Sequence, residues 1–214
     1  MRRALVAEAL GTALLVATVL GSAQMAATLT PDRGLLLLAN AGATGAMLYV
    51  LITVFGPLSG AHFNPLVSLV MAQRRDLPWR NLLPYIGGQT VGALAGLLLA
   101  HAMFNLPLVE ISTIPRGGSG QMLAEGMATF GLILTILGGL HARCNVPAVV
   151  ASYIAAAYWF TSSTSFANPV MLLARALTNT AAGISPSVTP GFLLAEIIGA
   201  MLAAALGAWL FRRS

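Results

Sequence analysis

Long apolar segments alternate with short polar stretches along the whole chain. A helix of about 20 predominantly apolar residues crosses the hydrocarbon core of a bilayer, which is about 30 Å thick. Most of the apolar segments are close to this length, and the polar stretches between them contain Pro, Gly, Asp or Arg. The pattern predicts six transmembrane helices, at about 4–28, 35–55, 82–104, 121–140, 147–161 and 191–211.

Two shorter apolar runs begin at an Asn-Pro pair, Asn64-Pro65 and Asn168-Pro169. Asn is a favoured N-cap residue, and Pro fits the first helical position because its missing N–H would have no partner there. Each run continues for about ten residues, or about 15 Å of helix, which is half of the bilayer core. These runs are therefore predicted to be half-spanning re-entrant helices, and the segment at 35–55 is expected to end at Gly56-Pro57.

The second half of the chain repeats the first. Leu5–Ser22 aligned with Met122–Gly139 gives seven identical pairs out of eighteen, among them Glu8 with Glu125. A secretory signal peptide is the alternative for the first segment, but a removable leader would not recur later in the chain. Three spans per half is an odd number, so the second copy enters the membrane from the opposite side.

These elements predict an all-α integral membrane fold with an inverted three-plus-three repeat. We expect one membrane domain over residues 1–214, with repeat one at about 1–104, a linker loop at 105–120 and repeat two at about 121–214.

The composition supports the membrane assignment and constrains the topology. The chain is 57% hydrophobic and only 8% charged, whereas soluble domains are about a quarter charged. Its net charge of +5 comes from arginine, and such an excess in a membrane protein indicates topology rather than nucleic-acid binding. With both termini in the cytoplasm, eight of the eleven arginines are cytoplasmic: Arg2, Arg3, Arg74, Arg75, Arg80, Arg143, Arg212 and Arg213.

The two half-helices predict the character of the pathway between them. Inversion brings their N-termini together near the midplane, and the non-helical stretches Ser59–Phe63 and Ser162–Ala167 would line a water-filled path with carbonyl groups. Asn64 and Asn168 would each cap a helix and present an NH₂ donor to the lumen. Two positive helix ends at one point repel cations. This arrangement is typical of a passive conduit for small uncharged solutes.

The same residues resemble a known family. Ser59-Gly-Ala-His62-Phe-Asn64-Pro65 is similar to the first signature of the aquaporins, or major intrinsic proteins, and Tyr85–Gly92 resembles their third helix. The resemblance implies a homotetramer in the inner membrane of the cell, surrounded by lipid and with one pore in each protomer. It also assigns the pore midpoint to Asn64, Pro65, Leu66, Asn168, Pro169 and Val170.

The resemblance also locates a selectivity filter. The family's second signature continues with an arginine, whereas Met171 stands at that position here. The implied filter is Thr44, Ala156, Ser165 and Met171, which suggests a wide pore. Leu66 and Val170 replace family alanines, and their bulk could narrow or shift the midpoint.

The residues around the second signature indicate a cargo. The sequence Thr161-Ser-Ser-Thr-Ser-Phe-Ala-Asn-Pro169 resembles bacterial aquaglyceroporins associated with arsenic resistance. The implied cargo is glycerol-like polyols, arsenite as neutral As(OH)₃, and water. A water-selective channel, or one for urea, ammonia or boric acid, remains the alternative.

Glu8 and Glu125 are ionisable residues inside apolar segments. The resemblance implies that they brace the pore loops, while a proton relay in a secondary active transporter is the alternative. His62 is expected to shape its loop, because no second ligand lies at metal-binding spacing. Glu196 has no acidic counterpart in the first half, where Gln89 occupies the similar place. No catalytic residue, metal or cofactor is predicted, and the protein is not expected to be an enzyme.

Overall fold

The computed structural model describes residues 1–211. Within that range it contains α-helices and two short 3₁₀ helices and no β-strand. The elements in chain order are α1 (Arg2–Leu29), α2 (Arg33–Ser59), α3 (Pro65–Gln73), η1 (Trp79–Asn81), α4 (Leu82–Met103), α5 (Ser119–Ala142), α6 (Val146–Phe160), α7 (Pro169–Ala176), η2 (Pro186–Val188) and α8 (Thr189–Leu210). Arg212 and Arg213, which the charge pattern places in the cytoplasm, lie outside the described residues.

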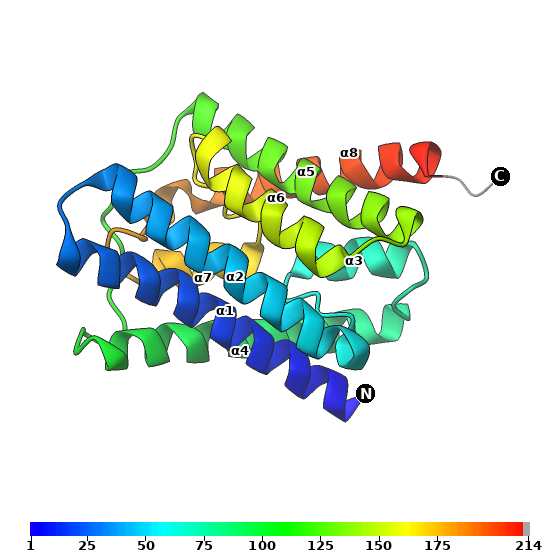
Figure 1. The fold of residues 1–214 in the computed structure, drawn as a ribbon, viewed down its shortest axis with the longest axis horizontal. Helices are drawn as coiled ribbons and strands as arrows, with labels where there is room; N and C mark the ends of the chain where they lie inside the picture. The colour runs from blue at the N-terminus through cyan, green and yellow to red at the C-terminus, as the bar shows by residue number, and fades with distance from the viewer. Residues whose placement is uncertain (212–214) are drawn as a thin grey trace.

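The long helices run side by side, and the two half-helices lie between them (Figure 1). α1 packs against α4 and α2, α5 packs against α8, and α2 packs against α6. α3 and α7 start near the middle of the bundle and run toward opposite ends, and α1 begins at the same end at which α8 finishes. The predicted all-α fold with an inverted repeat is confirmed.

Small residues allow the closest helix contacts. A Cβ atom built at Gly92 or Gly96 of α4 would collide with the backbone of Ala9 or Ala13 in α1. The second repeat has the same contact, where a Cβ at Gly199 of α8 would collide with the backbone of Gly126 in α5. In lipid, where the hydrophobic effect does not drive helices together, such close packing is a main source of association.

One helix ends later than the sequence predicts, and another has the predicted bounds but is short for a membrane span. α2 does not end at Gly56-Pro57 but continues to Ser59, and Gly60 then ends it in the left-handed conformation with φ 87°. Pro57 costs the helix one backbone hydrogen bond, which is tolerated so close to its end. α6 has only 15 residues, or about 22 Å of helix, and is shorter than the bilayer core. Five other helices are long and apolar enough to span a membrane.

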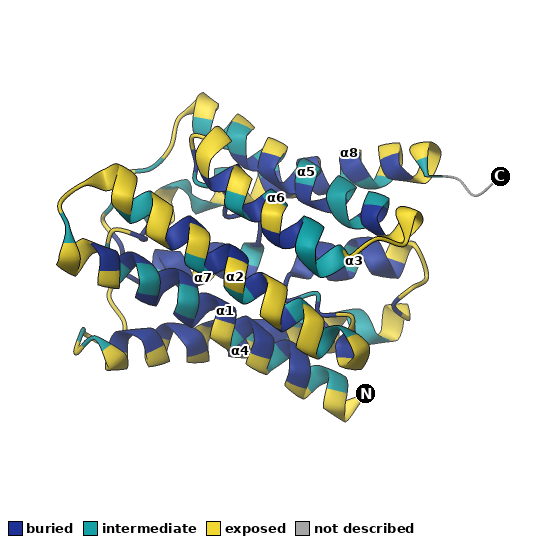
Figure 2. Cartoon of the chain, viewed as in Figure 1, coloured by how far each residue is buried: buried dark blue, intermediate teal, exposed yellow. Residues whose placement is uncertain are grey.

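The surface is apolar and several of the deepest side chains are charged or polar (Figure 2). Leu83 is 78% exposed and Trp209 is 68% exposed, whereas Glu8, Glu125 and Glu196 are fully buried. A soluble protein would show the opposite distribution. The exposed apolar side chains are therefore the lipid-facing surface of a multi-pass membrane protein.

The α1–α4 contact gives a test of this packing. Gly92→Ala places a methyl group against the Ala9 backbone, so we expect an overpacking cost of about 1–3 kcal/mol in the free energy of unfolding. Gly87→Ala is the matched control, because Gly87 lies in the same helix and a Cβ there has open space around it. Thermal unfolding in detergent, followed by circular dichroism, measures both variants. Equal stability of the two would contradict the close packing.

Candidate functional site

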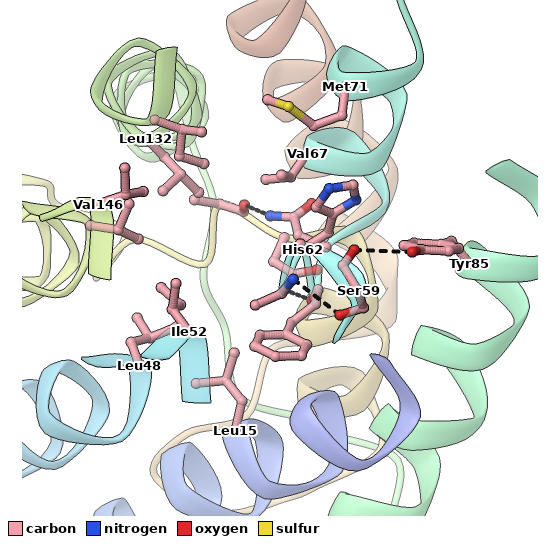
Figure 3. A pocket seen from close by; sticks show the side chains of 18 of the residues that line it. Leu15, Leu48, Ile52, Ser59, His62, Val67, Met71, Tyr85, Leu132 and Val146 are labelled. Atoms are coloured by element: carbon pink, nitrogen blue, oxygen red, sulfur yellow. Dashed lines mark hydrogen bonds between the residues drawn. The ribbon is translucent and has the colours of Figure 1, made fainter. Parts of the chain in front are cut away.

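A cavity of about 720 Å³ enters the bundle at the end where α1 begins and passes the start of both half-helices. At one end its lining includes Arg74, Asp76 and His141, and beyond the middle it reaches Thr44 and Met171. One wall is apolar, and the side that faces it carries polar groups of the first pore loop (Figure 3). The apolar wall is formed by Leu15, Leu48, Ile52, Leu132 and Val146, while Val67 and Met71 of α3 lie above His62 in that view.

Asn64 and Asn168 lock the two half-helices together at the centre of this cavity. The Oδ1 atom of Asn64 accepts from the Leu66 backbone N–H at 2.9 Å, and that of Asn168 accepts from Val170 at 3.2 Å. Each amide nitrogen then donates across to the opposite loop: Asn64 Nδ2 to the Ala167 carbonyl at 2.7 Å, and Asn168 Nδ2 to the Phe63 carbonyl at 2.9 Å. Each NH₂ group therefore donates one of its hydrogens in this lock, and the other hydrogen takes no part in it.

The two pore loops share an unusual backbone. Residues with positive φ recur in the same order before each asparagine, including Phe63 at 48° and Ala167 at 48° directly before it. Non-glycine residues adopt this conformation at a cost of about 1–2 kcal/mol each. The repeated pattern turns the carbonyls of Phe63 and Ala167 toward the opposite half-helix, where the asparagine amides bind them.

Glu8 holds the first pore loop in this shape. Its carboxylate accepts from the backbone N–H of His62 at 2.9 Å and of Phe63 at 2.7 Å. It also accepts from Ser59 Oγ at 2.6 Å and from Gln89 Nε2 at 2.7 Å. Both of its oxygens are thus occupied, which is the geometry that the loop-brace hypothesis requires.

Glu125 does the same for the second loop. Its two oxygens accept from the backbone N–H groups of Phe166 and Ala167, both at 2.9 Å. Glu196 binds the next backbone N–H group of the loop, because its Oε1 accepts from the Asn168 N–H at 3.1 Å. Two carboxyl groups therefore bind three consecutive backbone amides of this loop.

His62 lies in the cavity wall and shapes the first loop from its side chain. Its Nδ1 is 3.0 Å from Ser68 Oγ, and its ring lies 5.4 Å from that of Tyr85. The Tyr85 hydroxyl donates to the Ser59 carbonyl at 3.0 Å, as Figure 3 shows. Residues 1–211 contain no cluster of side chains that could hold a metal ion.

Three of the four predicted filter residues line the cavity together, namely Thr44, Ser165 and Met171. Ala156 does not: it lies on the exposed side of α6. Tyr158 lines the cavity instead, buried, with its hydroxyl 3.2 Å from Thr44 Oγ1.

Helical spacing was the signal that sequence reasoning missed. Ala156 shares a helix face with Trp159 and Phe160, both of which are exposed. Tyr158 instead shares the buried face with Ile154 and Ala151, at spacings of four and seven residues.

The remaining midpoint residues support the pathway without lining it. Leu66 and Val170 are buried in the hydrophobic core and do not contribute to the cavity wall. Pro65 and Pro169 form the first turns of α3 and α7. The two bulky replacements therefore fill space behind the pathway rather than inside it.

Two arginines support the second loop and the segment that follows α7. Arg175 is buried and stacks on the Phe166 ring, 3.5 Å from its centroid, while its Nε donates to the Ala182 carbonyl. Arg116, in the loop before α5, donates to the Gly183 carbonyl at 2.9 Å. Burial lowers the pKa of Arg116, and the nearby Glu125 opposes that shift.

Comparison with known proteins gives three consistent matches. A model of the major intrinsic protein family matches residues 1–211. The chain is 55% identical over 213 residues to aquaglyceroporin AqpS of Rhizobium meliloti (strain 1021), which covers 99% of this chain and 91% of that protein. The glycerol uptake facilitator protein of Streptococcus pneumoniae is 35% identical over 111 residues, or 45% of this chain and 47% of that protein.

The fold itself matches a solved structure. The X-ray structure of the aquaglyceroporin from Plasmodium falciparum superimposes with a TM-score of 0.79 at 19% sequence identity. The match covers 96% of this chain and 94% of that chain. It shows that the arrangement of helices is shared.

The lock between the half-helices can be tested without a transport assay. Asn168→Asp keeps the capping oxygen but removes the donor to the Phe63 carbonyl, so we expect a loss of about 1–3 kcal/mol in the free energy of unfolding. Asn145→Asp is the control, because Asn145 also caps a helix but makes no such second bond. The measurement is the thermal unfolding midpoint in detergent. If both variants unfold like the parent chain, the lock contributes nothing.

Proposed function

The chain belongs to the major intrinsic protein family, and on that premise we propose that it is an aquaglyceroporin for glycerol-like polyols and for arsenite as neutral As(OH)₃. Family members are channels rather than enzymes and pass water and small neutral solutes such as glycerol. The relative AqpS is named an aquaglyceroporin, and its alignment covers 99% of this chain. The choice among neutral solutes is the part that we propose.

The observation that supports this cargo is the group of hydroxyls at the far end of the cavity. Thr44, Tyr158 and Ser165 line it together with Met171. Ser165 Oγ is buried and has no hydrogen-bond partner among residues 1–211, so it could bond a solute hydroxyl once its side chain turns toward the cavity. An unpaired buried hydroxyl costs free energy that a hydroxylated solute would recover. Both glycerol and As(OH)₃ carry hydroxyl groups on a compact body.

The same lining argues for a wide, weakly polar filter. Met171 stands where the family carries an arginine, and neither the buried Arg175 nor the half-buried Arg116 lines the cavity. A flexible apolar side chain leaves room for a solute larger than water and suits its carbon skeleton. A water-selective filter would need a tighter and more polar constriction.

Cations are disfavoured along this path. The half-helices direct their positive ends at the centre, and the charged residues in the lining, Arg74 and Asp76, pair with each other at 2.9 Å near one end. Moving an ion past apolar walls without a partner is very costly. A coupled transporter is also disfavoured, because Glu8 has both oxygens bound to the pore loop and its neighbours.

We further propose that the channel is a homotetramer of the inner membrane with both termini in the cytoplasm. The arginines support this orientation. Arg2, Arg3, Arg74, Arg75, Arg80 and Arg143 all belong to the end of the bundle where α1 begins, while Arg33, Arg116 and Arg175 belong to the other end. Positive charge concentrates on the cytoplasmic side of membrane proteins.

Stopped-flow light scattering on proteoliposomes tests the cargo. Water, glycerol and As(OH)₃ entry are compared in one preparation, with empty liposomes as the background. We expect rapid glycerol and arsenite entry without saturation or ion dependence. Entry of water alone would refute the proposed cargo and leave the family assignment intact.

Met171 gives the first mutational test. Met171→Arg adds a large charged group to the filter, and we expect glycerol and arsenite entry to fall by about tenfold or more, equal to about 1.4 kcal/mol of added barrier, while water entry persists. Met171→Leu preserves apolar volume and serves as the control. Unchanged glycerol entry in Met171→Arg would show that this side chain does not limit the pore.

Tyr158 gives the second test. Tyr158→Phe removes one of the clustered hydroxyls, and we expect glycerol entry to fall by several-fold, or about 1 kcal/mol for one hydrogen bond, with less effect on water. Tyr49→Phe is the control, because Tyr49 is exposed and lies outside the cavity lining. The same light-scattering measurement applies. Equal glycerol rates in both variants would remove Tyr158 from the filter.

A further inference from the structure

The two halves of the repeat brace their pore loops with different chemistry. In the first half Gln89 Nε2 donates to Glu8 Oε2 at 2.7 Å. In the second half the similar place is taken by Glu196, which faces Glu125. The first brace is thus a carboxylate with an amide donor, whereas the second is a pair of carboxyl groups.

The surroundings of Glu196 do not accommodate a second anion. Glu196 and Glu125 are both fully buried and accept from the adjacent backbone N–H groups of Asn168 and Ala167, which brings their carboxyl groups together. Glu196 Oε1 accepts from the Asn168 N–H, and Oε2 has no hydrogen-bond partner among residues 1–211. Two carboxylates in such contact repel, so the pair shares one proton.

The neighbouring groups decide which carboxyl carries the proton. Glu125 accepts two backbone N–H bonds, one on each oxygen, and lies near enough to Arg116 and Arg175 to interact with their charges. Tyr153 and Tyr158 of α6 are the other titratable groups that face Glu125. Glu196 receives a single N–H bond. These contacts favour Glu196 as the carboxyl group that carries the shared proton.

We propose that Glu196 is a positioning residue that stays protonated, with its Oε2–H donating to the Glu125 carboxylate while its Oε1 holds the Asn168 N–H. This O–H replaces the amide donor that Gln89 supplies in the first half. Together the two glutamates hold the backbone of Phe166, Ala167 and Asn168, which directly follow the filter residue Ser165. Glu196 thereby fixes the solute path without touching the solute.

Two substitutions separate a proton donor from a simple space-filling residue. Glu196→Gln retains both an acceptor for Asn168 and a donor for Glu125, so we expect wild-type glycerol entry in proteoliposomes. Glu196→Met keeps the length but removes both groups, and we expect either loss of folded channel or about a tenfold lower rate per channel. A merely packed side chain would tolerate Met as well as Gln.

Infrared spectroscopy of the full-length protein at neutral pH tests the proton directly. We expect the carbonyl stretch of a protonated carboxylic acid in the wild type and its disappearance in Glu196→Gln. Glu110→Gln is the control, because Glu110 lies in an exposed loop and should leave that band unchanged.

The glycerol entry rates and the infrared band test different claims. If Glu196→Gln leaves the acid band in place, or conducts as poorly as Glu196→Met, the proposal is overturned. The glycerol rates rest on the proposed function, but the infrared result does not. A chain that conducts no glycerol at all would therefore refute the cargo while the band still decides the protonation of Glu196.

Discussion

Every backbone polar group at membrane depth needs a partner, and this constraint governs the centre of the molecule. The two pore loops leave helical geometry where lipid can offer no hydrogen bond. Their N–H groups point back into the protein, where Glu8 and Glu125 accept them. The carbonyls of Phe63 and Ala167 are bound by the opposite asparagine. Remaining carbonyls of the loops can face the cavity. The contacts that satisfy the loop backbone therefore also create a polar path.

The mutual dependence of the two loops explains why their strained backbone persists. Each left-handed residue is unfavourable alone, yet Phe63 and Ala167 donate to a glutamate and accept from an asparagine at the same time. Because each asparagine bonds the other loop, neither half-helix can shift without breaking the bonds of both. The close helix contacts at the glycines hold the surrounding bundle at the spacing that this lock needs.

The sequence predicts the scaffold well and the cavity lining less well. The spans and the two capped half-helices follow from apolar length and from Asn-Pro, which are local signals. The lining depends on how each helix is rotated, and counting from a motif placed Ala156 where Tyr158 lies. Leu66 and Val170 were expected to narrow the midpoint, but helix rotation turns them into the core. The hydrogen bond between Asn64 and the opposite loop joins residues about a hundred positions apart, so no local sequence pattern predicts it.

The scaffold is nearly symmetric between the two halves, but the cavity is not. The two properties depend on different side chains. The residues that hold the backbone recur in both halves, as Glu8 and Glu125 or as Asn64 and Asn168. Apart from the two asparagines, the polar residues of the loops that line the cavity do not recur: one loop presents His62, and the other presents Ser165 near Met171. An apolar wall opposite these polar groups suits a solute that has both a carbon face and hydroxyls, since such a solute keeps its hydrogen bonds on one side while it sheds water on the other. Selection among neutral solutes can thus change through the lining residues while the braced and locked backbone stays the same.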